Sequence, residues 1–389
     1  MRVATRRLLQ AAAVATGVGA AAVAVPLLAE PESVSVQVAA NGTPVPGQYI
    51  VTLKPGASTS AESGRIGAAD VKRFDGVLNA FSARLTAGQL AALRKNGRVA
   101  AIEQDQIVKT STVQRSPLPW NLDRIDQRSL PLSKSYSYRR DGRGVTAYVI
   151  DTGIAAGHPQ FGKRARSVWS APRFKGDGRD HNGHGTHVAG IIGAAHHGVA
   201  KGVQLRSLRV LDEYGSGSMS DVIAAARWLR LNAARPSVAN LSLTGNRSKA
   251  ANDAIAALSR SGVFVTTAAG NDGDDACRYS PAGAPLAFTV GATDSADRRA
   301  GWSNVGKCVE LHAPGKGIRS TWLGGGSRVA DGTSMAAPHA AGTAALFLSH
   351  RPKVGFLELQ KWLIDTSTKG KVRGLPAGAR NRLLYKGGL

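Results

Sequence analysis

Short apolar runs that alternate with helical stretches constrain the fold of this chain more than any other feature. Each run is bounded by Gly, Asp or Asn, and stretches between them, such as 221–233 and 249–261, are predicted to be helical. This alternation predicts an α/β fold in which helices cover both faces of a mainly parallel sheet. The expected strands are 145–150, 205–211, 238–243, 263–269 and 287–290.

A smaller α+β domain is expected before this sheet. Strand-like runs flank a short helix that Thr86 and Gln89 would start with a capping box. A polar stretch from Lys109 to Pro119 then separates this domain from the sheet. The expected strands are 49–53, 80–85 and 99–108.

The N-terminus has the layout of a secretory signal. Arg2, Arg6 and Arg7 precede a stretch rich in Ala, Val and Leu, residues 8–29. The stretch approaches membrane-spanning length, but Ala dominates it and Gly and Pro interrupt it, so its tendency to insert as an anchor is weak. We expect residues 1–40 to be a cleaved signal peptide and linker, and the protein to be secreted without a stable membrane anchor.

The chain is strongly basic, with 50 Lys and Arg against 26 Asp and Glu and a net charge of +24. Such a charge makes nucleic acid or another anionic surface a partner to consider. However, the basic residues are spread along the sequence, and Phe, Trp and Tyr make up only 5% of it. We therefore expect no specific nucleic-acid recognition.

Polar side chains follow two of the expected strands, at the edge where parallel sheets carry their active sites. Asp151 follows the first strand and precedes Thr152-Gly153; alone, it would be read as a turn residue. Asp-Thr-Gly also occurs in aspartic proteases, but their paired carboxylates would need a second such motif, which the sequence lacks. Asn271 follows the strand 263–269, where its amide could hold an oxyanion or belong to an ordinary loop.

Three histidines, His181, His184 and His187, lie three residues apart. A zinc site is a weak interpretation, because steps of three would fan the rings around a helix axis and no Glu follows as in His-Glu-x-x-His. His184 stands at an expected helix start, where it is well placed to act as a base.

Ser334 follows Gly332-Thr333 and precedes a stretch to Leu348 that is predicted to be helical. A helix N-terminus offers backbone N–H groups and a positive dipole end to a developing oxyanion. Thr333 or Ser334 could instead be a simple helix cap, and alone that interpretation would be preferred.

Four blocks, taken in order along the chain, resemble the signature motifs of subtilisin-like serine proteases. Further segments, among them 240–243, 279–282 and 381–385, resemble the proteinase K branch and especially aqualysin-like enzymes. The resemblance covers residues 117–389 as a peptidase domain, and residues 48–110 resemble the inhibitor-type propeptide of the family. The blocks are Asp151-Thr152-Gly153, His184-Gly185-Thr186-His187, Asn271 and Gly332-Thr333-Ser334-Met335-Ala336.

The resemblance implies a role for each block. Asp151 would orient His184, which would take the proton of Ser334 as that residue attacks the scissile carbonyl. Asn271 and the backbone N–H of Ser334 would hold the oxyanion. An α/β-hydrolase would order its triad as Ser, acid and His, whereas the order here is Asp, His and Ser. The propeptide would act as an intramolecular chaperone and then block the site, with self-processing between residues 110 and 119.

Peptide substrates would bind as an added strand between the segments 215–217 and 241–243, through backbone hydrogen bonds that are largely indifferent to sequence. The primary pocket would be walled by 242–245 and 268–270. Thr244 stands where the family usually has Gly, so we expect a narrower pocket. The residues expected to bind substrate are Gly215, Ser216, Gly217, Ser242, Leu243, Thr244, Ala268, Ala269 and Gly270.

The resemblance also implies a structural calcium site. Its ligands would be the carbonyls of Pro285 and Ala287 and the carboxylate of Glu310, where Asp is usual. No organic cofactor is expected.

The chain has two cysteines, Cys277 and Cys308, which are too few for a disulfide scaffold and are not spaced for zinc. One bridge and two free thiols are both compatible with the sequence. Export favours the bridge, and the aqualysin-like pattern has cysteines at matching places. That pattern also has a cysteine pair at the places of His181 and Glu213, so we expect these two side chains to face each other through a weak hydrogen bond.

Taken together, the residues and the resemblance predict a secreted, monomeric serine endopeptidase that acts on proteins and peptides and is made as a self-processing precursor. A non-catalytic protein of the same fold that binds peptides or polyanions is the competing hypothesis, although the intact catalytic positions and the propeptide argue against it. Sensitivity to chelators without sensitivity to serine-directed inhibitors would favour the hypothesis of a metalloprotease instead.

Overall fold

The computed structural model describes residues 33–38, 44–109 and 119–389. The expected signal stretch 8–29 and nearly all of the expected processing region lie outside these residues. Within them, no helix is both long and apolar enough to cross a lipid bilayer.

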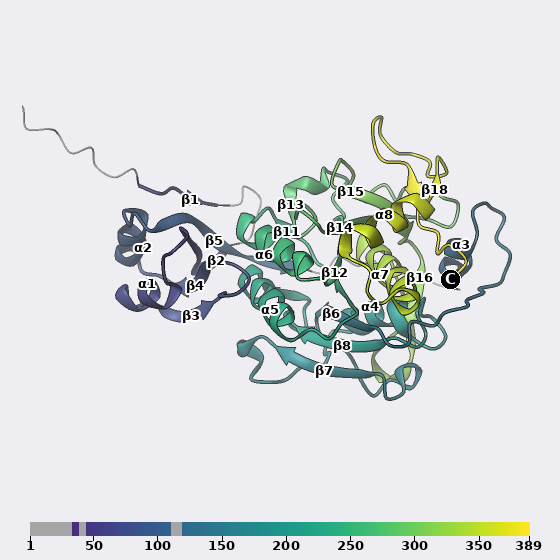
Figure 1. Cartoon of the computed structure of the whole chain (residues 1–389), viewed down its shortest axis with the longest axis horizontal. Helices are drawn as coiled ribbons and strands as arrows, with labels where there is room; N and C mark the ends of the chain where they lie inside the picture. Colours follow the sequence, from purple (N-terminus) through teal and green to yellow (C-terminus); the bar gives the residue numbers. More distant parts are fainter. Residues whose placement is uncertain (1–32, 39–43, 110–118) are drawn as a thin grey trace, which may run out of the picture. The chain divides into compact units, whose positions relative to one another are not determined.

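Among the described residues, nine strands form the central sheet of the domain after residue 119 (Figure 1). Its order is β18-β19-β15-β14-β12-β10-β6-β8-β7, and the neighbouring strands are parallel except for the pair β18–β19. The predicted mainly parallel sheet is therefore confirmed. The strands are β6 (Thr146–Asp151), β7 (Ala165–Ser170), β8 (Gln204–Arg209), β10 (Ser237–Leu241), β12 (Phe264–Ala268), β14 (Phe288–Thr293), β15 (Val309–Pro314), β18 (Thr368–Lys369) and β19 (Arg382–Leu383).

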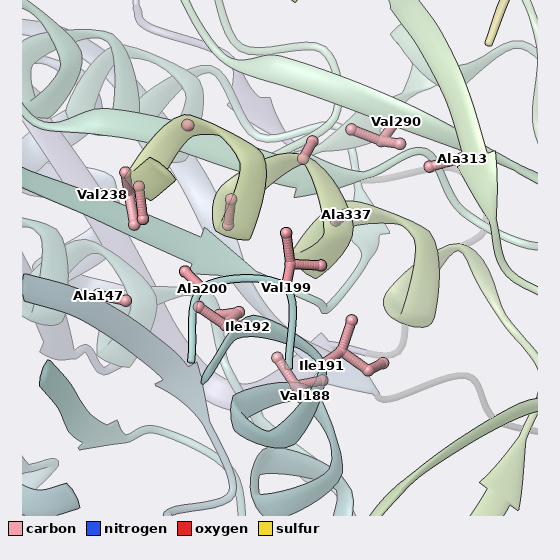
Figure 2. Packing of buried hydrophobic residues seen from close by; sticks show 14 of the residues in the cluster. Ala147, Val188, Ile191, Ile192, Val199, Ala200, Val238, Val290, Ala313 and Ala337 are labelled. Atoms are coloured by element: carbon pink, nitrogen blue, oxygen red, sulfur yellow. The ribbon is translucent and has the colours of Figure 1, made fainter. Parts of the chain in front are cut away.

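Helices cover both faces of this sheet because its strands are apolar on both sides. The helices of one core are α4 (His184–Gly193), α7 (Thr333–His350), α3 (Trp120–Asp126) and α8 (Phe356–Thr366), and those of the other are α5 (Met219–Asn232) and α6 (Lys249–Arg260). In β6, Ala147 and Val149 lie in the first core, whereas Tyr148 and Ile150 lie in the second. Figure 2 shows part of the first core, where small and branched apolar side chains of α4, α7 and the strands meet.

Short elements complete this domain and shape its surface. Among them, β9 pairs with the N-terminal domain and β11 pairs with β13. They are β9 (Ser216–Ser218), β11 (Gly245–Asn246), β13 (Tyr279–Ser280), the hairpin of β16 (Ile318–Thr321) and β17 (Ser327–Ala330), and the helical turns η1 (Pro159–Phe161), η2 (Pro172–Phe174), η3 (Ala276–Arg278) and η4 (Leu323–Gly325).

Residues 33–38 and 44–109 fold as an α+β domain whose sheet has the order β1-β5-β2-β4-β3. The capping box of Thr86 and Gln89 is confirmed at the start of its second helix. The first helix and β3 were not predicted, because they fall in a stretch rich in Gly, Ala and Ser without a clear period. The elements are β1 (Val36–Gln37), β2 (Pro44–Leu53), α1 (Thr59–Arg65), β3 (Ala69–Arg73), β4 (Ala80–Arg84), α2 (Ala87–Arg94) and β5 (Val99–Lys109).

The N-terminal domain contributes apolar side chains to two separate cores. Val51, Phe81 and Leu93 form a core on the side of its own helices. Ile50 and Phe74 belong instead to the core of α5 and α6. A domain of this size buries a smaller fraction of its surface than a larger domain does, so packing on α5 and α6 supplies additional apolar burial.

Candidate active site

Asp151 and His184 form a buried hydrogen-bonded pair at the carboxyl edge of the sheet. Asp151 ends β6 and His184 begins α4, and their side chains are 0% and 2% exposed. His184 Nδ1 lies 2.8 Å from Asp151 Oδ1, which also accepts the N–H of Thr152 at 2.7 Å. Because the carboxylate accepts from Nδ1, the neutral ring has its lone pair on Nε2. Nε2 is buried without a hydrogen-bond partner among the described residues, so it is available as a base.

Another carboxylate, that of Asp180, fixes the start of α4 against β6. Its Oδ1 accepts from Thr152 Oγ1 and from the N–H of Gly183, both at 2.8 Å. Gly185 permits this packing, because a Cβ there would lie 2.1 Å from the carbonyl oxygen of Gly153. Sequence reasoning assigned no role to Asp180, although an Asp shortly before a helix is a recognised start signal.

Ser334 is the second residue of α7 and is bonded to the residue that follows β10. Its hydroxyl donates to the carbonyl of Ser242 at 3.1 Å, and its own carbonyl accepts from Ser242 Oγ at 2.7 Å. That carbonyl is free to do so because Pro338, four residues on, has no N–H to donate. Since β10 and β6 are neighbours in the sheet, these bonds place Ser334 on the same edge as Asp151.

Asn271 is held by the first residue of the same helix. Its Oδ1 accepts both the N–H of Thr333, at 2.9 Å, and the Oγ1–H, at 2.8 Å, while Gly270 N–H donates to Thr333 Oγ1 at 3.0 Å. An atom that accepts twice is the amide oxygen, so the Nδ2 group is directed away from Thr333. Thr333, which sequence reasoning treated only as a candidate helix cap, therefore orients this amide beside Ser334.

A strand of the N-terminal domain lies where the substrate strand was expected. β5 pairs antiparallel with β9, so the sheet of the N-terminal domain continues into the larger domain. Gly217 in β9 is required, because a Cβ there would lie 2.3 Å from the carbonyl oxygen of Val210. Gly215 turns the chain toward β9 with a φ of +74°. The paired residues are Ile107 with Ser218, Val108 with Gly217 and Lys109 with Ser216.

Thr244 and Gly270 face each other at the expected primary pocket. Gly270 has a φ of +101°, and a Cβ built on it would lie 3.6 Å from Cγ2 of Thr244. The methyl group of Thr244 therefore reduces the space between these two walls. The other residues expected there lie at the ends of neighbouring strands: Ser242 and Leu243 follow β10, and Ala268 and Ala269 lie at the end of β12.

The expected calcium ligands do not fit a cation in this structure. The carboxylate of Glu310 lies 2.7 Å from Arg380 and 3.6 Å from Arg382. A calcium ion bound by this carboxylate and the carbonyls of Pro285 and Ala287 would meet two guanidinium charges. In the ranges that the structure describes, no group of three or more His, Cys, Asp and Glu side chains is arranged to hold a metal.

Cys277 and Cys308 are joined in a disulfide, with their Cα atoms 5.4 Å apart. It links η3 to the residue before β15.

The predicted contact between His181 and Glu213 is wrong. His181 Nε2 lies 2.7 Å from Oδ2 of Asp177, four residues before it, and Arg209 holds the same oxygen at 3.1 Å. The two loops do touch, because Asn182 Nδ2 donates to the carbonyl of Glu213 at 2.9 Å. The imidazole of His181 therefore binds the nearer carboxylate of Asp177, which Arg209 already positions.

Two family models match the chain. The model described as Peptidase_S8, the subtilase family, matches residues 142–381, and the model described as peptidase inhibitor I9 matches residues 48–111.

Similar proteins include named proteases from bacteria. The chain is 46% identical over 317 residues to alkaline serine exoprotease A of Vibrio alginolyticus, a match that covers 80% of this chain and 59% of that protein. It is 46% identical over 316 residues to an extracellular serine proteinase of Thermus sp. (strain Rt41A), covering 81% of this chain and 77% of that one. A solved structure of a cold adapted subtilisin-like serine proteinase matches with a TM-score of 0.67 and 47% identity, over 69% of this chain and 97% of that chain. The chain therefore belongs to the subtilase family of serine proteases, with an inhibitor domain of the I9 type before its peptidase domain.

Proposed function

We propose that the chain is the precursor of a secreted serine endopeptidase that hydrolyses peptide bonds through an acyl-enzyme on Ser334. The observation that carries the proposal is the buried pair of Asp151 and His184, whose Nε2 has no hydrogen-bond partner in the described part of the chain, at the sheet edge that also holds Ser334. A buried polar atom without a partner costs about 1–3 kcal/mol. Use of Nε2 as a base, on a ring that Asp151 fixes through Nδ1, gives a chemical reason for this cost.

Each group has one task in the proposed reaction. The Ser334 hydroxyl turns from the Ser242 carbonyl to His184 Nε2, which takes its proton as the oxygen attacks the peptide carbonyl. Asp151 stabilises the imidazolium through the 2.8 Å hydrogen bond. Asn271 Nδ2 and the Ser334 N–H hold the oxyanion, and one such donor is worth about 3–4 kcal/mol. His184 then gives the proton to the leaving amine, and water releases the acyl group by the reverse sequence.

The N-terminal domain is proposed to keep this site closed by binding as a strand. A peptide substrate cannot pair with β9 while β5 occupies it. Two carboxylates of β5 also bind the positive ends of helices. Glu103 accepts the N–H of Ala250 at the start of α6, at 2.6 Å, and Asp105 accepts that of Ser220 at the start of α5, at 3.1 Å.

Export from the cell is part of the proposal. The Thermus relative is named an extracellular proteinase, and a disulfide such as that of Cys277 and Cys308 persists in oxidising compartments. The enzyme would act there as a monomer on protein substrates.

One variant tests both processing and hydrolysis. Wild type and the control Ser295→Ala, a change of an exposed serine, should lose the N-terminal domain and hydrolyse casein, and a serine-directed phosphonate should stop that hydrolysis. Ser334→Ala should remain an uncut precursor. Normal maturation of Ser334→Ala in a protease-deficient host would contradict the proposal. A wild type that stays uncut and inactive would favour the non-catalytic binding protein.

A further inference from the structure

A groove of about 530 Å³ lies beside β9 and is lined by charged residues of both domains. One of its carboxylates belongs to Asp221, the third residue of α5, whose side chain is 1% exposed. Lys72 of β3 places its ammonium group 2.6 Å from Asp221 Oδ1. The N-terminal domain thus places a cation against the wall of the groove that the peptidase domain forms.

The peptidase side of this groove has an excess of one negative charge. Arg173 lies 3.1 Å from Asp221 and 3.9 Å from Asp212, so one guanidinium faces two carboxylates. Arg173 is held in this place, because it also donates to two backbone carbonyls at 2.8 and 3.0 Å. When the N-terminal domain leaves, Lys72 leaves with it, and Asp221 Oδ1 loses the cation bound to it.

The groove lies beside the strand that a substrate must form with β9. Ile107 pairs with Ser218. Its side chain lines the groove together with that of Asp105, two residues before it. Alternate side chains of a strand point to the same side. The substrate residue that takes the place of Ile107 therefore directs its side chain toward the groove, where a long cationic side chain can replace that of Lys72.

We propose that Asp221 and Asp212 form a subsite that binds a Lys or Arg side chain of the substrate, at the residue that pairs with Ser218. This inference rests on the proposed endopeptidase function and adds a charge preference to backbone pairing that is otherwise indifferent to sequence. Lys72 occupies the subsite in the precursor, so the N-terminal domain binds there as a basic substrate would.

Two synthetic peptides test the subsite on the mature enzyme. Both reproduce residues 103–116 of this chain, with Lys in one and Gln in the other at the place of Ile107. We expect kcat/KM to be about tenfold higher for the Lys peptide at low salt, and the ratio to fall as salt screens the charges. Asp221→Asn should bring the ratio close to one, and Asp221→Glu should keep most of it. Asp253→Asn, which removes a surface acid of α6, should leave the ratio as in wild type.

The outcomes separate the subsite from the proposed function. Equal kcat/KM for the two peptides in wild type at low salt overturns the subsite and leaves the peptidase intact, since both peptides are cut. A Lys preference that persists in Asp221→Asn assigns it to another group and also overturns the proposal. If Asp221→Asn does not mature, Asp212→Asn should still lower the ratio, and an unchanged ratio counts against the subsite. If wild type cuts neither peptide and the phosphonate does not label Ser334, the proposed function fails together with the subsite.

Discussion

The buried carboxylate of Asp105 makes the stability of the precursor depend on pH. Its side chain is fully buried, and its Oδ1 accepts the N–H groups of Ser220 at 3.1 Å and Gln106 at 2.9 Å. Oδ2 is buried without a hydrogen-bond partner among the described residues. Loss of hydration disfavours the ionised form more than the hydrogen bonds favour it. Burial therefore raises the pKa of Asp105 from its ordinary value of 3.8 to about 6.

Proton binding and folding are linked, which sets the sign of the effect. Because the pKa is raised in the folded precursor, the stabilisation from Asp105 is full below pH 3.8 and is lost as pH rises through about 6. The difference between the two pKa values corresponds to about 3 kcal/mol in total, of which about 2 kcal/mol is lost between about pH 4.5 and pH 7.5. The N-terminal domain is therefore held less tightly at neutral and alkaline pH than in mild acid.

Asp105→Asn in an uncleavable Ser334→Ala background measures this contribution. Asn has the shape of a neutral carboxyl group and keeps an acceptor for Ser220, but it does not titrate. Urea unfolding between about pH 4.5 and pH 7.5 should show the Asp105 form losing about 2 kcal/mol more than the Asn form. Glu103, whose pKa burial also raises, is present in both forms and cancels in the comparison. Equal pH dependence of the two forms would refute the reasoning.

Three further variants probe the peptidase domain. Asn271→Ala should lower kcat by about 10²–10³ with little change in KM in peptide hydrolysis, because an oxyanion donor is lost; a change in KM alone would assign Asn271 to binding. Thr244→Gly should raise the kcat/KM of peptides with Phe in the primary pocket relative to Ala by about tenfold or more; an unchanged ratio would show that Thr244 does not limit the pocket. Glu310→Gln and wild type should show the same change in melting temperature when calcium is added, as measured by scanning fluorimetry. A rise in melting temperature that wild type shows and the variant lacks would support the calcium site of Glu310 with Pro285 and Ala287.

The positions of residues that follow a buried strand could be predicted, because the strand itself is recognisable in the sequence. Asp151 and Asn271 each follow an apolar run, and parallel strands bring their carboxyl ends to one edge. The proposed nucleophile, Ser334, and the proposed base, His184, lie at the starts of helices far apart in the sequence, so their assignment depended on the order of the motifs. Asp180, which holds α4 against β6, lies in a loop without periodicity, and its partner Thr152 is 28 residues away. Such a contact has no signal in local sequence.

The contacts between the two domains could not be predicted, because the residues of β5 that make them carry no distinguishing pattern in the sequence. Glu103 and Asp105 lie in the predicted strand 99–108, where Gln104 and Gln106 make both faces polar, so the sequence does not mark the two acidic side chains for burial. The structure buries them, leaving Glu103 5% and Asp105 0% exposed. The N–H groups at the starts of α5 and α6 have no partner within their own helices, and the two carboxylates accept from them. This role can be recognised only when it is known which helices the strand contacts.

In the proposed maturation, cleavage of the chain and release of the N-terminal domain are separate physical steps. The pairing of β5 with β9, the helix contacts of Glu103 and Asp105, and the ion pair of Lys72 with Asp221 all come from residues before 110. A cut beyond Lys109 removes none of these contacts. It removes the tether, which turns an association at roughly millimolar effective concentration into a bimolecular one. Dilution then favours release, and ionisation of Asp105 at neutral and alkaline pH favours it further. Inhibition should therefore outlast cleavage until the cut domain is diluted or degraded.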